Sequence, residues 1–452
     1  MPHLDPQHLA DWSYGTWGNT RPEQITGMGI DTRQLRAGQG FVAVTTARRD
    51  GHDFLSDARA RGASCALVNR VMDDPLPQLL VNDTLVALRR IAAGWRESFP
   101  FPVVAVTGSV GKTSTKEMLR ACLGAKAHAT EANLNNTLGV PLTLLAADPA
   151  TASSAVIEVG MSEPGELGLS AQVVRPDVAV VTAVAEVHLE GVGSLAGIAH
   201  EKAELVRHLA PSGEAFVPSH LLVHQAFAQL APRLVALVFN QDEVPKGVRR
   251  VVPVQLQAEG AGWSLRISDP VLGAFHLLLG DIPEGHARNA ALAALAARRA
   301  GATVSDITQA LAAWRPLAGR GSIHRDGPRE LHIDCYNASP ASLADAAAAF
   351  VRRTQAPRLW VLGGMAELGA RSRELHAQAG RNLPLGKGDR VIGFGGDADA
   401  LAEACGGSVM QDFSALTAAI AAWSGPVLIK GSRAHTLERA LPEAVRQTLG
   451  FH

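Results

Sequence analysis

Short apolar runs rich in β-branched residues alternate with longer amphipathic stretches along most of the chain, and this alternation predicts an α/β fold. The N-terminal part has apolar runs at 41–44, 65–68 and 78–81, which we interpret as strands. Helical patterns at 53–62 and 83–97 separate or follow these runs. The first part of the chain is therefore expected to form a small α/β unit.

Two proline-containing stretches, at 100–102 and 314–320, divide the chain into three parts. Proline resists continuing a helix, so both stretches are typical of linkers. The predicted domains are an N-terminal α/β domain at 1–99, a central domain at 100–316 and a C-terminal domain at 317–452.

The last two parts have the pattern of parallel sheets. The middle part opens with a strand at 103–106 and ends with an alanine-rich helix at 287–300 and a helix near 304–314, which indicates a mostly parallel sheet. The last part repeats strand then helix, with strands expected at 332–334, 359–362, 390–394 and 426–430. This spacing predicts right-handed crossovers in a small Rossmann-like unit.

The composition narrows the class of protein. Apolar residues make up 47% of the 452 residues, so the chain can build sizeable cores. The net charge of −1 lacks the basic excess of nucleic-acid-binding proteins, and no run approaches the ~18 apolar residues of a membrane span. The four cysteines form no CxxC pair, and the first residues lack the apolar core of a secretory signal. We therefore expect a cytoplasmic protein that binds neither nucleic acid nor membrane, and we treat it as a monomer.

The most informative segment is the loop after the strand at 103–106. The strand enters Thr-Gly-Ser-Val-Gly-Lys-Thr, and a helix with one apolar face leaves it. A helix N-terminus points backbone N–H groups and a positive dipole at the loop, which suits a triphosphate. Lys112 would reach the β- and γ-phosphates, and Thr113 would offer a hydroxyl to Mg²⁺. The predicted ATP contacts in this loop are Gly108, Ser109, Val110, Gly111, Lys112, Thr113 and Ser114.

The loop is a variant of the standard P-loop. Val106 stands where the eight-residue P-loop has glycine, so the match is to a shorter TGxxGKT form. The alternative is an ordinary strand–turn–helix that carries Gly-Lys-Thr by chance.

Two further groups are expected near the same edge of the sheet. Glu158 lies within an apolar strand, and a buried carboxylate needs a cation or several donors. His188 follows the next strand, and the carboxyl ends of neighbouring strands form the ligand crevice of such sheets. Glu158 could instead cap a helix at an exposed strand end, and His188 could be an ordinary loop histidine.

Lys202 falls on the apolar face of a predicted helix, between Leu205 and Val206. Lysine stems often lie along apolar surface with the charged end in water, which is one interpretation. The other is that Lys202 is carbamylated by CO₂ and becomes an anionic oxygen ligand for a second Mg²⁺.

Together these motifs resemble the Mur ligase superfamily, the ATP-dependent amide-forming enzymes of peptidoglycan synthesis. The resemblance covers nearly the whole chain. The segments that carry it are 29–33, 38–43, 48–54, 107–113, 133–141, 158–161, 188–190, 201–204, 319–320, 334–340, 361–369 and 430–433.

The resemblance implies roles for individual residues. Implied catalytic residues are Lys112, Glu158, His188, Lys202 and Arg320. Implied ligands of two Mg²⁺ ions are Thr113, Glu158, His188 and the carbamate on Lys202. Implied ATP contacts outside the loop are Asn289 at the adenine, Arg320 at the γ-phosphate and Asp334 at the ribose. Implied substrate contacts are Asp31, Thr32 and Arg33 at the uridine diphosphate, Asn135, Asn136 and Thr137 at the acceptor, and Tyr336 and Asn337 near the incoming dipeptide.

Several positions depart from the superfamily pattern. Ala132, His286 and Gly364 stand where glycine, asparagine and aspartate are usual, and 216–219 replaces the usual acidic loop. None of these changes removes an implied phosphate or metal group, but they leave the amino substrate open.

The resemblance implies an ATP-dependent ligase that adds D-alanyl-D-alanine to UDP-N-acetylmuramoyl-tripeptide through an acyl phosphate. The N-terminal domain would bind the UDP-sugar, the central P-loop domain ATP, and the Rossmann-like domain the amine and part of ATP. One alternative is another ligase of the superfamily with a different amine or acid, although a folate enzyme usually lacks the ~100 residues that precede the loop. A P-loop nucleotide switch is the other alternative.

Overall fold

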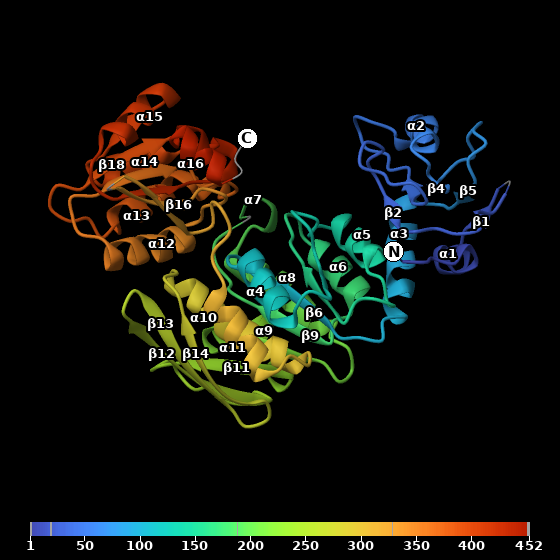
Figure 1. Ribbon diagram of the computed structural model, residues 1–452, viewed down its shortest axis with the longest axis horizontal. Coiled ribbons are helices and arrows are strands. Elements are labelled where there is room, and N and C mark those ends of the chain that lie inside the picture. Colours follow the sequence, from blue (N-terminus) through green and yellow to red (C-terminus); the bar gives the residue numbers. More distant parts are fainter. Residues whose placement is uncertain (1, 19, 188, 328, 450–452) are drawn as a thin grey trace.

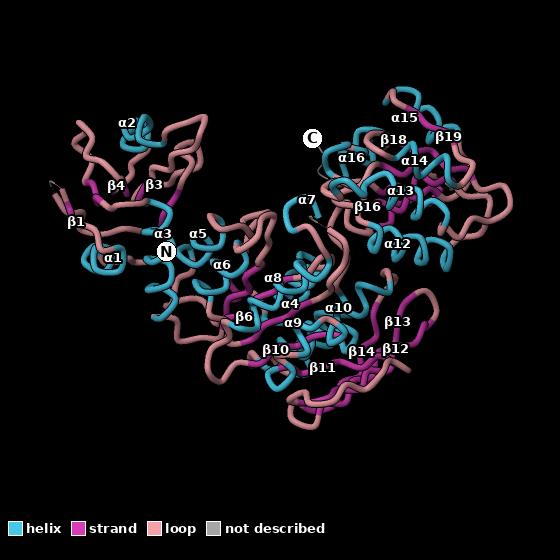
Figure 2. Tube along the Cα trace, turned by 180° about the vertical axis from the view of Figure 1, so that it is seen from behind, coloured by secondary structure: helices cyan, strands magenta, loops and turns pink. Residues whose placement is uncertain are grey.

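Three α/β units follow one another along the chain in the computed structural model, which describes residues 2–18, 20–187, 189–327 and 329–449. Each unit is built on its own sheet, of five, nine and six strands. Both views place the nine-stranded unit between the other two (Figures 1 and 2). The predicted α/β fold of three units is confirmed, while the boundaries at 99/100 and 316/317 stay predictions.

The N-terminal sheet has the strand order β1-β5-β4-β3-β2, and all of its pairs are parallel except β1 with β5. Its strands are β1 (Thr16–Trp17), β2 (Met28–Gly29), β3 (Gly40–Val42), β4 (Cys65–Val68) and β5 (Gln78–Leu80). Its helices are α1 (Pro6–Ser13), α2 (Leu55–Ala60) and α3 (Thr84–Glu97). The two predicted helices and three predicted strands of this unit are present, with ends shifted by a few residues.

The central sheet has the order β14-β13-β12-β11-β10-β9-β6-β8-β7. Its parallel strands are β6 (Val103–Thr107), β7 (Ala127–Ala129), β8 (Ser154–Glu158), β9 (Val178–Val181), β10 (Glu214–Pro218), β11 (Leu234–Phe239) and β12 (Arg250–Glu259). Its helices are α4 (Lys112–Leu123), α5 (Gly139–Ala146), α6 (Glu166–Val174), α7 (Leu189–Val192), α8 (Leu195–Arg207), α9 (Gln225–Ala228), α10 (Glu284–Arg299) and α11 (Val304–Ala313).

Helices cover both faces of this parallel region, which explains why its strands are apolar without interruption. Val103 and Ala105 of β6 pack in one core with residues of α5, α6 and α8. Val104 and Val106 pack in another core with residues of α4, α10 and α11. The alternation of side chains along one strand therefore supplies both cores.

An antiparallel extension at the sheet edge was not predicted. Strand β12 continues into β13 (Gly262–Asp269) and β14 (Gly273–Leu279), which pair antiparallel. β14 alternates buried and exposed side chains along most of its length, as expected for a sheet with one solvated face.

The C-terminal sheet has the order β15-β16-β20-β17-β18-β19, antiparallel only at β15. Its strands are β15 (Ser322–Asp326), β16 (Arg329–Asp334), β17 (Leu359–Gly363), β18 (Arg390–Phe394), β19 (Ser408–Met410) and β20 (Val427–Lys430). Its helices are α12 (Pro340–Arg353), α13 (Ser372–Arg381), α14 (Ala398–Ala404), α15 (Phe413–Ala422) and α16 (Glu443–Thr448). β20 returns to the middle of the sheet, between β16 and β17, so the strand order changes there, and ligands of such sheets bind at the strand carboxyl ends.

The segment before β15 joins the last two units. Gly319 and Gly321 have φ of 71° and 83°, left-handed values that favour glycine. The Tyr336 N–H donates to the Gly319 carbonyl, and the Gly321 N–H donates to the Ile333 carbonyl. Arg320, between these glycines, is therefore attached to the backbone of the C-terminal unit. No helix among the described residues is long and apolar enough to cross a membrane.

Candidate active site

The phosphate loop connects β6 to α4 in a left-handed backbone conformation. Gly108 and Gly111 have φ of 152° and 84°, values that side-chain-bearing residues rarely adopt. The Ser109 N–H donates to the Ala183 carbonyl at 2.8 Å, and the Thr182 hydroxyl donates to the Val110 carbonyl. The loop is therefore fixed to the end of β9, and its remaining N–H groups at the start of α4 suit an anion.

Lys112 lies over this loop, and its ammonium donates to the Gly108 carbonyl at 2.7 Å. Burial lowers the pKa of Lys112, Glu158 nearby raises it, and Arg320 lowers it again. Lys112 therefore shares the electrostatic environment of a carboxylate from the same unit and of an arginine carried by the C-terminal unit.

Glu158, at the end of β8, is buried and accepts hydrogen bonds from side chains. The Thr113 hydroxyl and the Asn135 amide donate to its Oε1 at 3.1 and 2.8 Å. Its Oε2 is buried and has no hydrogen-bond partner in the described part of the chain. Glu158 thus faces the phosphate loop rather than capping a helix, and its second oxygen is available to a cation.

Lys202 of α8 is 2% exposed, so its charged end does not reach water. Among the described residues no hydrogen bond or ion pair to its ammonium group is present. Burial holds the pKa of Lys202 well below its usual value, and the positive charge of Lys112 lowers it further, while Glu201 raises it. A buried lysine of this kind favours the neutral amine, which is the form that reacts with CO₂.

His188, a predicted metal ligand, lies outside the described residues. Within the described ranges, no group of three His, Cys, Asp or Glu side chains is arranged to hold a metal ion. The unpartnered Oε2 of Glu158 beside the Thr113 hydroxyl is nevertheless the oxygen donor set that Mg²⁺ prefers.

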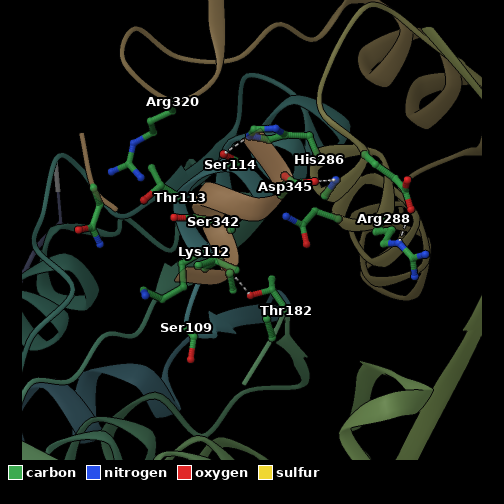
Figure 3. Close-up of a pocket in the computed structure, with 18 of the residues that line it drawn as sticks. Ser109, Lys112, Thr113, Ser114, Thr182, His286, Arg288, Arg320, Ser342 and Asp345 are labelled. Atoms are coloured by element: carbon green, nitrogen blue, oxygen red, sulfur yellow. Dashed lines mark hydrogen bonds and ion pairs between the residues drawn. The ribbon is translucent and has the colours of Figure 1, made fainter. Parts of the chain in front are cut away.

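A cavity of about 310 Å³ lies between the phosphate loop and the C-terminal unit. Figure 3 shows Lys112, Thr113 and Arg320 around this space. The predicted ATP residues that line it are Ser109, Val110, Gly111, Lys112, Thr113, Ser114, Asn289, Arg320 and Asp334. Tyr336 and Asn337 also line it, and Asp334 forms an ion pair with Lys430 at 2.9 Å. The cavity therefore combines residues that are more than 200 positions apart in the sequence.

Other predicted substrate residues do not line this cavity. Asp31 and Arg33 form a bidentate ion pair on the N-terminal unit, with contacts of 2.9 and 2.7 Å. These hydrogen bonds lower the pKa of Asp31 to about 2. Asn136 accepts from the N–H groups of Leu138 and Gly139 at the start of α5.

Sequence reasoning missed several cavity residues. Asp345 accepts from the Gly285 N–H at 3.0 Å and so links α12 to the start of α10. Its only signal was an isolated acid in an alanine-rich helix. His286 was noted only as a departure, although it is hydrogen-bonded to the Ser114 hydroxyl at 3.0 Å.

The structure explains one departure from the superfamily pattern. A Cβ at position 364 would lie 2.7 Å from Nε2 of His435, so that imidazole fills the space of a larger side chain. Glycine at 364 is thus matched to His435.

Replacing Gly111 by alanine tests the loop geometry. A Cβ there would lie 2.3 Å from Nδ2 of Asn289 in addition to the left-handed strain. We expect Gly111→Ala to weaken ATP binding by about tenfold or more, since it displaces a group that lines the nucleotide cavity. Gly124, at the other end of α4, is a matched control because it has φ of 83° and open space around it. Gly124→Ala should lower the free energy of unfolding by a similar ~1 kcal/mol strain but leave ATP affinity unchanged in a calorimetric titration. Equal ATP affinities for Gly111→Ala and Gly124→Ala would contradict the claim that a side chain at position 111 displaces Asn289 from the nucleotide cavity.

Stability is expected to fall as the pH is lowered from 7 to 5. Burial lowers the pKa of His286 and of His332 to about 4, so between pH 6.5 and 4 the unfolded chain binds more protons than the folded one. Each histidine should cost about 1–2 kcal/mol of unfolding free energy over this range. Urea unfolding at pH 7 and pH 5 measures how much the free energy of unfolding falls. The fall should be smaller in His286→Asn and in His332→Phe. If the unfolding free energy of both variants fell with pH as steeply as that of the unaltered protein, protonation of these two histidines would not be the cause.

Fold and cavity together define a nucleotide-binding enzyme in which a second α/β unit faces a phosphate loop. Three family descriptions match the chain: "Mur ligase family, catalytic domain" at residues 24–93, "Mur ligase middle domain" at 106–297 and "Mur ligase, glutamate ligase domain" at 319–433. The chain belongs to the Mur ligase family of ATP-dependent ligases.

Named relatives extend this comparison over more than nine-tenths of the chain. The UDP-N-acetylmuramoyl-tripeptide–D-alanyl-D-alanine ligase of Escherichia coli K12 is 35% identical over 91% of this chain and 93% of its own. A crystal structure of MurF from Acinetobacter baumannii has a TM-score of 0.86 at 28% identity, covering 97% of this chain and 98% of that one. MurF from Thermotoga maritima, solved in complex with ADP, has a TM-score of 0.79 at 26% identity, covering 94% and 98%.

Proposed function

We propose that this protein joins D-alanyl-D-alanine to the peptide carboxylate of UDP-N-acetylmuramoyl-tripeptide, with ATP as the source of free energy. Support comes from the names of relatives that align along more than nine-tenths of the chain. The observation that carries the proposal is the cavity in which Lys112 of the central unit and Arg320 of the C-terminal unit face the same space.

The reaction requires an activated carboxylate. A carboxylate oxygen attacks the γ-phosphorus of ATP, the bond to the bridging oxygen breaks, and ADP leaves. The dipeptide amine then attacks the acyl carbon, the bond to the phosphate oxygen breaks, and the amine gives up a proton. The products are an amide, ADP and phosphate. Lys112 and Arg320 would stabilise negative charge on the transferred phosphoryl group, and the phosphate-loop N–H groups would position it.

Thr113, Glu158, His188 and a carbamate on Lys202 would hold two Mg²⁺ ions. When bound, Mg²⁺ supplies charge neutralisation at the phosphates. The fit rests on the unpartnered Oε2 of Glu158 and on the neutral amine favoured for Lys202. Carbamylation forms a bond between Nζ and the carbon of CO₂ and releases a proton, so it converts a buried neutral amine into an anionic oxygen ligand that a cation would pair with.

The remaining substrate residues are assigned by their place in the molecule. Asp31, Thr32 and Arg33 would bind the uridine diphosphate on the N-terminal unit, and Asn135, Asn136 and Thr137 would contact the acceptor. Asn289 and Asp334 would hold the adenosine, while Tyr336 and Asn337 would lie near the dipeptide. Because these groups lie on three units, the units would close around the substrates and exclude water from the acyl phosphate. The enzyme would act as a monomer in the cytoplasm, where ATP is supplied.

Product analysis with defined substrates tests the proposal. The protein is incubated with ATP, Mg²⁺, UDP-N-acetylmuramoyl-tripeptide and D-alanyl-D-alanine, and the nucleotide product is identified by mass spectrometry. We expect the pentapeptide, with ADP formed only when acceptor and amine are both present. ADP formation without either substrate would favour a nucleotide switch, and a product with a different amine from a panel would favour another ligase of the family.

A further inference from the structure

Arg433 lies just after the carboxyl end of β20, the strand that pairs with β16 and β17 in the middle of the C-terminal sheet. Its Nη1 donates to Oε1 of Glu438 at 2.7 Å, and its side chain is 56% exposed. In the part of the chain that the structure describes, its other guanidinium nitrogens have no hydrogen-bond partner. Arg433 therefore has free N–H groups near the carboxyl end of β20, and one hydrogen bond to Glu438 holds its side chain.

Glu438 fixes this position because it is nearly buried, with a side chain 9% exposed. Its Oε2 is buried and, among the described residues, unpartnered. A carboxylate in this setting depends on its arginine more than an exposed partner would, so the pair orients the guanidinium.

Tyr336 places Arg433 relative to the phosphate site. The guanidinium carbon of Arg433 is 5.9 Å from the Tyr336 ring centroid, and that of Arg320 is 3.7 Å from the same centroid. Arg320 lines the phosphate-loop cavity, whereas Arg433 does not. One aromatic ring thus contacts both Arg320, which lines the phosphate-loop cavity, and Arg433, which lies outside it.

Lys430, the last residue of β20, is a nearby cation that already has partners. Lys430, 2% exposed, forms an ion pair with Asp334 and donates to the Asn337 carbonyl at 2.8 Å. Lys430 is therefore committed to groups on the nucleotide side. Arg433, in contrast, keeps guanidinium nitrogens without a hydrogen-bond partner among the described residues, so it can bind an anion that approaches from the strand ends.

We propose that Arg433 binds the C-terminal carboxylate of the incoming dipeptide, an assignment that rests on the proposed function. An extended dipeptide spans about 7 Å. The guanidinium carbons of Arg320 and Arg433 cannot be farther apart than the sum of their distances to the Tyr336 ring centroid, which are 3.7 and 5.9 Å. The amine can thus reach the acyl carbon beside Arg320 while the carboxylate pairs with Arg433. The planar guanidinium matches a carboxylate in bidentate geometry.

A carboxylate-to-amide change in the substrate tests this contact. The amide of D-alanyl-D-alanine keeps the reacting amine and removes the negative charge. For the unaltered enzyme we expect kcat/KM to fall about 10- to 100-fold from the dipeptide to its amide. For Arg433→Gln we expect equal, low values for both substrates and an unchanged KM for ATP.

Two further variants complete the design. Glu438→Gln should raise the KM for the dipeptide less than Arg433→Gln does, because it only loosens the guanidinium. Arg439→Gln is the matched control, since Arg439 lies over the Phe413 ring at 4.5 Å and should keep the full discrimination. Discrimination retained by Arg433→Gln, or none in the unaltered enzyme, would overturn the assignment. No product with the dipeptide in the unaltered enzyme would instead overturn the proposed function, and the assignment with it.

Discussion

Lys112→Ala should lower the rate of ADP formation by about 10²–10³-fold or more, the scale for loss of one electrostatic donor to a transition state. Lys112 is the cation on the phosphate loop itself, where its ammonium is held by the Gly108 carbonyl and lies near Arg320 and Glu158. Alanine removes this charge from a partly buried site, and water does not supply an equivalent cation there. The measurement is steady-state kcat with both substrates saturating.

The control for this variant is Lys126→Ala, which removes an exposed lysine outside the nucleotide cavity. Lys126→Ala should keep its kcat, and both variants should keep cooperative urea unfolding. A Lys112→Ala enzyme with more than half of the normal kcat would contradict the role of Lys112.

Lys202→Met is the second change with a large expected effect. Methionine fills much of the same volume but cannot be carbamylated, so we expect turnover to fall by about 10²–10³-fold. Because Lys202 is a buried amine with no hydrogen-bond partner among the described residues, its loss should leave the free energy of unfolding unchanged or raised. Carbon-13 NMR with labelled CO₂ reports the carbamate directly, independently of activity.

Lys116 provides the matched control, because it is also buried but donates to the Thr130 carbonyl and pairs with Glu117. The labelled carbamate signal should be present in the unaltered protein and in Lys116→Met, and absent from Lys202→Met. A signal that survives in Lys202→Met would assign the carbamate to another residue, and no signal in the unaltered protein would remove it altogether.

The fold followed from the sequence where periodicity was strong. The uninterrupted apolar run at 103–106 predicted the strand β6, and the helices α3 and α10 were found within a few residues of their expected ends. The strands β12 to β14 were not predicted, although β12 and β14 alternate buried and exposed positions, which is the pattern of strands with one solvated face. Their antiparallel pairing depends on contacts between strands, which the alternation within one strand does not specify.

In the candidate site, contacts within one unit were predictable from the sequence, whereas contacts between units were not. Contacts within the central unit, such as Thr113 with Glu158, followed from strand ends that share one edge of the sheet. The approach of Arg320 to Lys112 and the hydrogen bond from Gly285 to Asp345 join the central and C-terminal units. These contacts depend on how the units dock, and no local pattern encodes that docking.

The transfer of an oxygen atom tests the account most directly. If Lys112 and Arg320 serve a phosphoryl group that moves to a carboxylate, then the released phosphate must carry one oxygen from that carboxylate. The acceptor is labelled with oxygen-18 in its terminal carboxylate, and the phosphate is analysed by mass spectrometry after one round of ligation. We expect one labelled oxygen per phosphate formed. Phosphate that contains only unlabelled oxygen would mean that ATP is hydrolysed by water, and would contradict activation of the carboxylate in this cavity.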